Sequence, residues 1–202
     1  MIGKQLAIAL AIALGTGGSA MASTTIDFES TATGTYTSLV YGAVTISFLD
    51  GNHSFDVDNQ TPGPPISQHN LISYFQNPGA GSFQAIFAGG ASSVSIGMGD
   101  FNQDDDEGNL RAYDTANNLL DTAFILVPAS VFGGATMTVS SNTSISRVEW
   151  NETGSFAGAV YWDNLTYSAA NGGVPEPATW GLMLMGFGGL GAMLRRRRVA
   201  LA

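Results

Sequence analysis

Short segments in which apolar and polar side chains alternate run through the middle of this chain, and they restrict its fold more than any other feature. In residues 24–29 and 44–48, isoleucine, phenylalanine and valine alternate with acidic or hydroxyl side chains. This period of two is typical of a β-strand with one buried face, because successive side chains of a strand point to opposite faces. The same reasoning predicts further strands over residues 82–87, 92–97, 110–113, 119–126, 136–139, 145–150 and 159–167.

Turn-forming residues lie between these predicted strands. Gly89-Gly90, Asn117-Asn118, Gly133-Gly134 and residues 140–142 are the clearest, and the proline-rich residues 59–70 are expected to form a long surface loop. Many short strands with polar turns are typical of a β-sandwich or a jelly roll. We therefore expect residues 23–170 to form a single all-β domain. The chain has no cysteine, so this domain must be stabilised by its core and not by disulfides.

The N-terminal residues have the pattern of a secretory signal peptide. Lys4 precedes an unbroken apolar run over residues 6–14, and Ala20-Met21-Ala22 offers small residues at a cleavage site. An apolar run of this length is too short to span about 30 Å of hydrocarbon. We expect residues 1–22 to be removed on export.

The C-terminal residues combine three elements in a fixed order. Pro175, Glu176 and Pro177 cannot continue a strand or a helix, because proline lacks an N–H and restricts the preceding residue. An uncharged apolar stretch follows and begins close to Trp180, a residue type that favours membrane interfaces. The arginines Arg195, Arg196, Arg197 and Arg198 come after it. A basic cluster beside an apolar segment stays on the cytoplasmic side, so residues 178–194 are expected to form a short transmembrane helix.

This tail closely resembles the PEP-CTERM sorting signal of Gram-negative bacteria, including the Pro-Glu-Pro-x-x-Trp opening and the glycine-rich residues 186–191. The resemblance implies that residues 171–202 are a linker plus a sorting signal, which anchors the chain transiently in the inner membrane. It also implies an exosortase as processing partner, with removal of the tail near residues 175–177. Export to the cell surface or the extracellular matrix would follow, often in organisms that make exopolysaccharide and biofilm. The alternative is an ordinary weak C-terminal anchor.

The charge of the predicted domain excludes some partners. Outside the two terminal signals only Arg111 and Arg147 are basic, against 15 acidic residues, so the formal net charge is −13. Such a domain repels nucleic acid and anionic lipid surfaces. Divalent cations and glycans are the more compatible partners.

An acidic stretch is the first candidate metal site. Oxygen-bearing side chains occur at alternate positions, namely Asp100, Asn102, Asp104 and Asp106, and Ca²⁺ takes six to eight oxygen ligands. The EF-hand template fails here, because its sixth and twelfth positions are not occupied by glycine and glutamate. A solvated acidic turn remains the alternative interpretation.

The two ends of the predicted domain supply a second candidate. It opens with Asp27-Phe28-Glu29 and closes with residues 162–165, Trp-Asp-Asn-Leu. These strings resemble the first and last strands of galactose-binding-like and carbohydrate-binding jelly rolls, in which neighbouring terminal strands share a structural Ca²⁺. The resemblance implies that Glu29 and Asp163 are its side-chain ligands. The alternative is two outward-facing acids on surface strands.

Glycan binding would require exposed aromatic faces beside polar groups. Tyr74 and Phe75 follow the proline-rich loop and are the predicted surface candidates, whereas Trp150 and Trp162 suit either a ligand contact or the core. The chain contains no recognised nucleophile, metal-protease or phosphate-binding motif, so we predict no catalytic residues and no enzyme. The expected function is that of an exported structural or adhesive protein, associated with exopolysaccharide or biofilm and stabilised by Ca²⁺. A dedicated carbohydrate-binding module is the alternative.

Overall fold

The computed structural model describes residues 22–72, 82–101, 105–129, 133–153, 160–170, 183 and 185–187. The chain divides into two compact units, one formed by residues 21–172 and one by the two terminal segments. Within the terminal unit, residues 183 and 185–187 are helical. No helix in the described ranges is both long enough and apolar enough to cross a membrane. The predicted signal peptide, linker and sorting helix otherwise lie outside the described residues, and their boundaries stay predictions.

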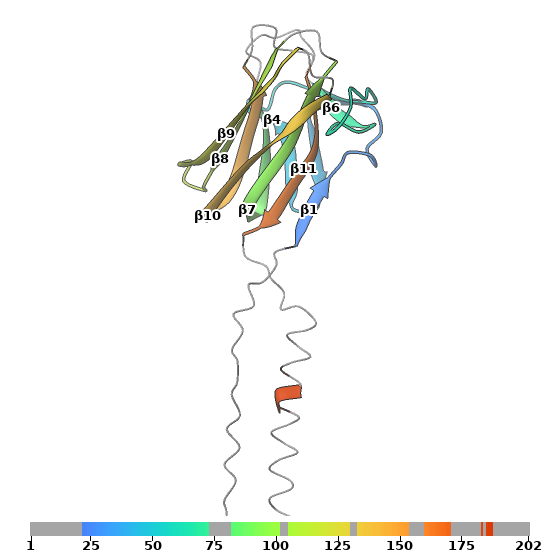
Figure 1. The fold of residues 1–202 in the computed structure, drawn as a ribbon. Coiled ribbons are helices and arrows are strands. Elements are labelled where there is room, and N and C mark those ends of the chain that lie inside the picture. Colours follow the sequence, from blue (N-terminus) through green and yellow to red (C-terminus); the bar gives the residue numbers. More distant parts are fainter. Residues whose placement is uncertain are drawn as a thin grey trace, which may run out of the picture. The chain divides into compact units, whose positions relative to one another are not determined.

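The larger unit is built from β-strands throughout its described residues (Figure 1). The strands are β1 (Ser23–Ile26), β2 (Gly34–Tyr36), β3 (Ser38–Tyr41), β4 (Val44–Phe48), β5 (Phe55–Asp58), β6 (Asn70–Ile72), β7 (Phe83–Asp100), β8 (Asp106–Tyr113), β9 (Leu119–Val127), β10 (Gly133–Glu152) and β11 (Tyr161–Ala169). Every pairing between them is antiparallel.

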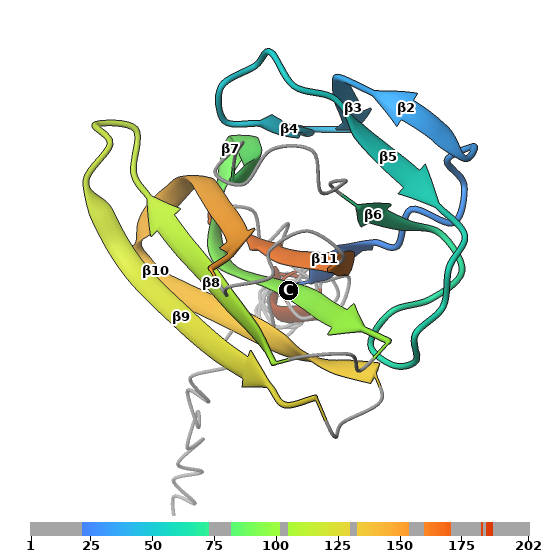
Figure 2. The same ribbon diagram turned by 90° about the horizontal axis from the view of Figure 1, so that it is seen from above.

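Two long strands, β7 and β10, join two layers of the sandwich. The first part of β7 lies between β4 and the end of β10, and β8 and β9 extend this side. The second part of β7 lies between β11 and the beginning of β10. We call the layer β3-β4-β7-β10-β8-β9 the β8 layer and the layer β2-β5-β6-β11-β7-β10 the β11 layer. Figure 2, seen from above, places β8 and β9 on one side of the domain and β5 and β6 on the other.

The prediction that Gly89-Gly90 and residues 140–142 form turns is wrong, because β7 and β10 bend at these segments and continue. Both segments lie inside strands, where the β7–β10 ladder continues across two register shifts between Ser140 and Arg147. Gly90 has a φ of 71°, and a Cβ atom on it would meet Ser144 Oγ at 2.0 Å. Glycine and a bulge thus bend the pair without ending it, because a bulge locally increases twist and curvature.

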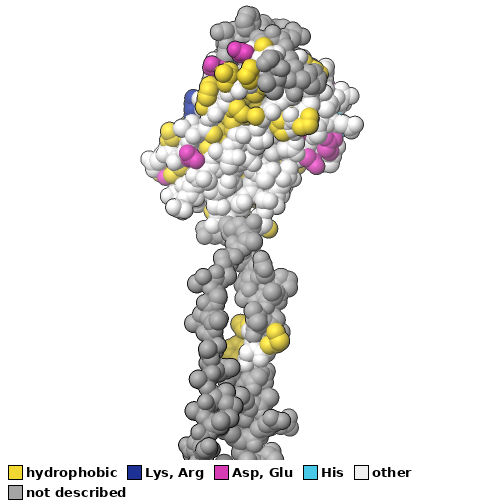
Figure 3. Space-filling view, in the orientation of Figure 1, with side chains coloured by type: hydrophobic (Ala, Val, Ile, Leu, Met, Phe, Trp, Pro, Cys, Tyr) yellow, Lys and Arg dark blue, Asp and Glu magenta, His cyan; other side chains and the backbone are white. Residues whose placement is uncertain are grey.

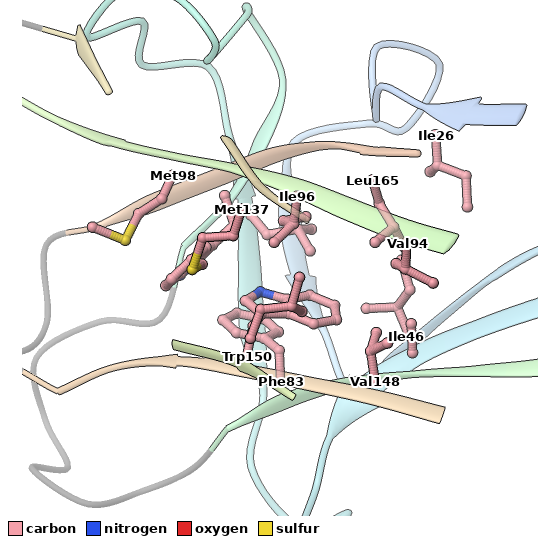
Figure 4. Packing of buried hydrophobic residues seen from close by; sticks show 14 of the residues in the cluster. Ile26, Ile46, Phe83, Val94, Ile96, Met98, Met137, Val148, Trp150 and Leu165 are labelled. Atoms are coloured by element: carbon pink, nitrogen blue, oxygen red, sulfur yellow. The ribbon is translucent and has the colours of Figure 1, made fainter. Parts of the chain in front are cut away.

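The core fills the space between the layers and confirms the all-β sandwich. Buried and more exposed side chains alternate along several strands as predicted; in β4, for example, Val44, Ile46 and Phe48 are all buried. Trp150 is fully buried and stacks on Phe83 with ring centroids 5.4 Å apart (Figure 4). Trp162 is also buried, at 2% exposure. Both tryptophans are therefore core residues and not ligand contacts.

Four short strands, β2, β3, β5 and β6, were not predicted. Each has only three or four residues and lacks a run long enough to show a clear period. The first predicted strand is also shorter than expected, since it ends at Ile26 and Phe28 adopts a φ of 59°. Its alternation nevertheless holds, with Phe28 buried and Asp27 and Glu29 exposed.

Candidate functional site

The outer edge of β11 is shared by two strands, and a polar dipeptide lies between them. β6 pairs with Tyr161 and Trp162, and β1 pairs with residues 165–168. The residues between, Asp163 and Asn164, mark a register shift against β7, and Asn164 has a φ of 53°. Asparagine tolerates this left-handed conformation better than most residues. This irregularity changes the direction of the Asp163 side chain at the place where the first strand, β1, meets the last strand, β11.

The proline-rich segment between β5 and β6 covers this point. A Cβ atom on Gly97 would lie 2.9 Å from Pro65, and one on Gly99 would lie 2.8 Å from Ile66. The N–H of Gly134 donates to the carbonyl of Pro64 at 3.0 Å. Glycines on β7 and β10 therefore allow the segment to pack directly on the β11 layer. The predicted surface loop is thus partly buried, with Ile66 only 3% exposed.

Asp163 is a fully buried carboxyl group held by hydrogen bonds from this segment. The Ser67 N–H donates to Asp163 Oδ2 at 2.7 Å, and the Ser67 hydroxyl contacts the same oxygen. The N–H of Asn164 donates to Oδ1 at 2.6 Å. Burial raises the pKa of Asp163 to about 6, although the hydrogen bonds from Ser67 and Asn164 act in the opposite direction. The nearby charge of Glu29 raises this pKa further.

Glu29 lies on the exposed side of the same cluster. Its Oε1 accepts a hydrogen bond from the His69 N–H at 3.3 Å. The pKa of Glu29 lies below its usual value, mainly because the Ser67 side chain hydrogen-bonds to its carboxylate. Hydrogen bonds from the backbone N–H groups of His69 and Gln68 lower this pKa further. Ser67 therefore links Glu29 to Asp163. The structure brings together the two carboxylates that the sequence paired, although only Glu29 faces outward and Asp163 is buried.

Two buried polar atoms in the same segment have no hydrogen-bond partner among the described residues. They are Asn70 Oδ1 and His69 Nδ1. Asn70 is fully buried, and its Nδ2 donates to the carbonyls of Gln60 and Ser67 at 2.5 and 3.2 Å. A buried polar group without a partner costs about 1–3 kcal/mol, so an additional ligand or water at this place would be favourable. Sequence reasoning missed Ser67 and Asn70, because nothing in the pattern connects this loop with β11.

The donor atoms of the cluster determine which ligands suit it. Glu29, Asp163, Ser67 and Asn70 carry oxygen atoms, the donor type that Ca²⁺ prefers. The described ranges contain no group of three or more acidic, histidine or cysteine side chains arranged to bind a metal. A cation here would therefore depend on carbonyl oxygens or water for its other ligands.

The acidic stretch between β7 and β8 is only partly described. Asp100 ends β7 and Asp106 begins β8, and both are buried, with 6% and 4% exposure. Asp105 Oδ1 accepts the N–H of Ala129 at 2.8 Å, so it supports a neighbouring chain segment. Asn102 and Asp104 lie outside the described residues. Calcium binding in this stretch stays a prediction, as does the role of Tyr74 and Phe75, which are also outside the described ranges.

Several solved structures resemble the chain in fold at low sequence identity. An adhesin domain of Lys-gingipain from Porphyromonas gingivalis w83 matches with a TM-score of 0.41 and 14% identity, covering 72% of this chain and 97% of that one. A DUF4465 family protein from Bacteroides caccae matches with a TM-score of 0.46 and 12% identity, covering 73% and 99%. A family 22 carbohydrate-binding module of Clostridium thermocellum matches with a TM-score of 0.46 and 10% identity, covering 73% and 92%. No curated protein sequence matches the chain.

The C-terminal residues match a family model. The model describes the PEP-CTERM protein-sorting motif, and the match covers residues 173–198. It includes the Pro-Glu-Pro residues 175–177, Trp180 and the arginines at 195–198, all of which lie outside the described residues. The chain therefore carries a PEP-CTERM sorting motif, which marks it for export and for sorting to the cell surface by an exosortase.

Proposed function

We propose that the β-sandwich acts outside the cell as a structural, adhesive component associated with exopolysaccharide, and that Ca²⁺ bound between Glu29 and Asp163 stabilises it. The sorting motif at residues 173–198 is the observation that supports an extracellular role. The buried Asp163 carboxyl supports the cation, since its pKa is raised and its described partners are hydrogen-bond donors without positive charge. A dedicated carbohydrate-binding module is the second candidate, and the two differ in how they bind glycan.

The cation would act on stability and not on a reaction. When bound, Ca²⁺ would supply positive charge that offsets the burial of Asp163 and its repulsion by Glu29. The same segment offers two neutral oxygen atoms: the Ser67 hydroxyl, and Asn70 Oδ1, which has no hydrogen-bond partner among the described residues. Such an ion would tie the loop between β5 and β6 to the first and last strands. The acidic residues 100–106 are the other place where calcium could bind.

Sorting is tested in a host that contains an exosortase. The full chain and a variant with Pro175→Ala, Glu176→Ala and Pro177→Ala are followed by cell fractionation and by the size of the product. We expect the unchanged chain to lose its tail and reach the surface, and the variant to keep its tail in the inner membrane. Equal processing of both would refute the assignment to an exosortase.

Calcium binding is tested by titration calorimetry and thermal unfolding of the full chain in detergent. We expect saturable binding and a higher melting temperature for the unchanged chain and for Asp104→Ala, and neither effect for Asp163→Ala. The reverse result for the two variants would move the site to the acidic residues 100–106. No heat and no stabilisation at millimolar Ca²⁺ would refute both calcium sites.

Association with exopolysaccharide is tested by sedimentation of the chain with matrix purified from an exosortase-containing bacterium. A structural component predicts weak binding that changes with Ca²⁺ and salt. A dedicated module predicts saturable binding to one defined glycan. Failure to sediment with any glycan would refute both.

A further inference from the structure

The outward face of the β8 layer gathers the only basic side chains of the described residues. Arg111 lies on β8 and Arg147 on β10, and their side chains point away from the core because the residues beside them in sequence, such as Leu110 and Val148, are buried. The rest of the domain is strongly acidic, with 15 acids against these two arginines. In Figure 3 the basic atoms come into view at the left edge of the domain, close to hydrophobic side chains.

The Arg147 side chain interacts with three neighbouring side chains. Its Nη2 lies 2.9 Å from Glu149 Oε1 and donates to Asn117 Oδ1 at 2.5 Å, and its guanidinium carbon lies 4.7 Å from the centre of the Tyr113 ring. Glu149 is only 7% exposed although it lies on an outward face. This pair therefore forms a fixed part of the surface and offers little to a ligand.

Arg111 differs from Arg147, because it makes no hydrogen bond and no ion pair with any residue in the described parts of the chain. It is half-buried and lies directly opposite Glu149, whose carboxylate is already paired with Arg147. The ion pair between Arg147 and Glu149 leaves the positive charge of Arg111 without a counter-charge among the described residues. Glu107, the other acid on this side of β8, lies four residues before Arg111 in the strand.

Hydrogen-bonding and aromatic side chains surround Arg111 in rows set by the strand register. One row crosses β9, β8 and β10 and consists of Phe124, Asn109 and Asn151. The next row consists of Thr122, Arg111, Glu149, Gln84 and Ser47. At the ordinary strand spacing, a row of five residues spans about 19 Å. Such a row is long enough to contact several linked sugars.

Two of these residues have properties of a binding surface. Asn109 Oδ1 is buried and has no hydrogen-bond partner among the described residues, so a further hydrogen bond to this amide would be favourable. Phe124 is 60% exposed on the edge strand β9. An exposed aromatic ring beside amides and an arginine suits a sugar, because the C–H face of a sugar ring packs on the aromatic ring while its hydroxyls bond to polar groups.

We propose that this face of the β8 layer binds a polysaccharide whose repeating unit carries a carboxylate, with Arg111 receiving the carboxylate, Asn109 bonding to hydroxyls and Phe124 packing on a sugar ring. An arginine fork matches a carboxylate with two parallel hydrogen bonds, and Arg111 has no ion-pair partner among the described residues that would compete for the fork. Repulsion from distant acids is weakened beyond about 8 Å at physiological salt. The inference rests on the proposed association with exopolysaccharide and names the glycan class and the surface.

The test measures binding of the full chain to polygalacturonate and to neutral dextran at 150 mM NaCl. We expect saturable binding to polygalacturonate, weakened roughly ten- to a hundredfold by Arg111→Gln and partly retained by Arg111→Lys. Asn59→Asp is the matched control, because it makes the same change in net charge at an exposed loop position between β5 and β6 and should leave binding unchanged. Any contribution of the basic tail is common to all variants. Phe124→Ala, an exposed change, should weaken binding without lowering the melting temperature.

The outcomes separate this inference from the proposed function. Equal binding by the unchanged chain and by both Arg111 and Phe124 variants would overturn the assigned face while leaving association with glycans intact. Binding to dextran but not to polygalacturonate would overturn the carboxylate class. No binding to either glycan, or to the purified matrix, would refute the proposed function together with this inference.

Discussion

The protonation of Asp163 leads to a prediction about stability and pH. Its folded pKa of about 6 lies above the ordinary value of 3.8, so the folded state binds the proton more tightly than the unfolded state. A carboxyl group with a raised pKa lowers stability when it is ionised, and this loss disappears as the pH falls below 6. Two pKa units correspond to about 3 kcal/mol at pH 7.5 in the absence of a cation.

The perturbation is Asp163→Asn, which keeps the shape of the side chain and removes the charge. Its carbonyl oxygen can still accept the Ser67 N–H, although it loses the stronger hydrogen bonds of a carboxylate. We therefore expect the variant to be more stable than the unchanged chain by up to about 3 kcal/mol at pH 7.5 with a chelator present. Between pH 7.5 and pH 5 the unchanged chain should gain roughly 1 kcal/mol relative to the variant.

The assay is urea unfolding of both proteins at several pH values, with and without Ca²⁺. The difference between them isolates Asp163, because every other ionisable group is present in both proteins. Added Ca²⁺ should reduce or reverse the advantage of the variant, since only the unchanged chain keeps the charge that attracts the ion. A difference in unfolding free energy that stays constant between pH 7.5 and pH 5 would contradict the raised pKa and the reasoning built on it.

Three further predictions concern the core, the strand contacts and the tail. Trp150→Ala should lower the free energy of unfolding by about 3–5 kcal/mol in a urea titration, whereas Phe124→Ala at the exposed edge should change it by less than about 0.5 kcal/mol; equal effects would contradict the stacked core. Gly134→Ala should destabilise by at least about 1–3 kcal/mol, because its Cβ would lie 1.7 Å from the Met98 carbonyl oxygen, while Gly89→Ala, with open space around it, serves as control. If Gly134→Ala melts at the same temperature as the control, the close β7–β10 contact is wrong. Replacing the Pro-Glu-Pro residues 175–177 by alanine should leave the melting temperature of the β-sandwich unchanged in calorimetry, since they lie in the other compact unit; a large shift would show that the tail takes part in the fold.

The candidate site shows which of its features the sequence pattern could predict and which it could not. The alternation of residues 24–29 was enough to predict a first strand with Glu29 on the polar side, and the string around Asp163 was enough to suggest its partner. The pattern could not reveal that Asp163 is fully buried. That burial follows from the loop carrying Ser67, which packs on Gly97 and Gly99, and such a long-range contact leaves no periodic signal in the chain.

Local features of the chain determined the positions of its longer strands and the character of its sorting tail, because these depend on side-chain period, proline chemistry and charge within a few residues. Tertiary structure alone decided that Gly89-Gly90 bends a strand instead of ending it, since the answer depends on whether the partner strand β10 bulges at the same level. It also decided that Arg111 and Arg147 share one face. Their strands are adjacent only through the register between β8 and β10, and pairing partners distant in sequence are chosen by the packing of the whole domain.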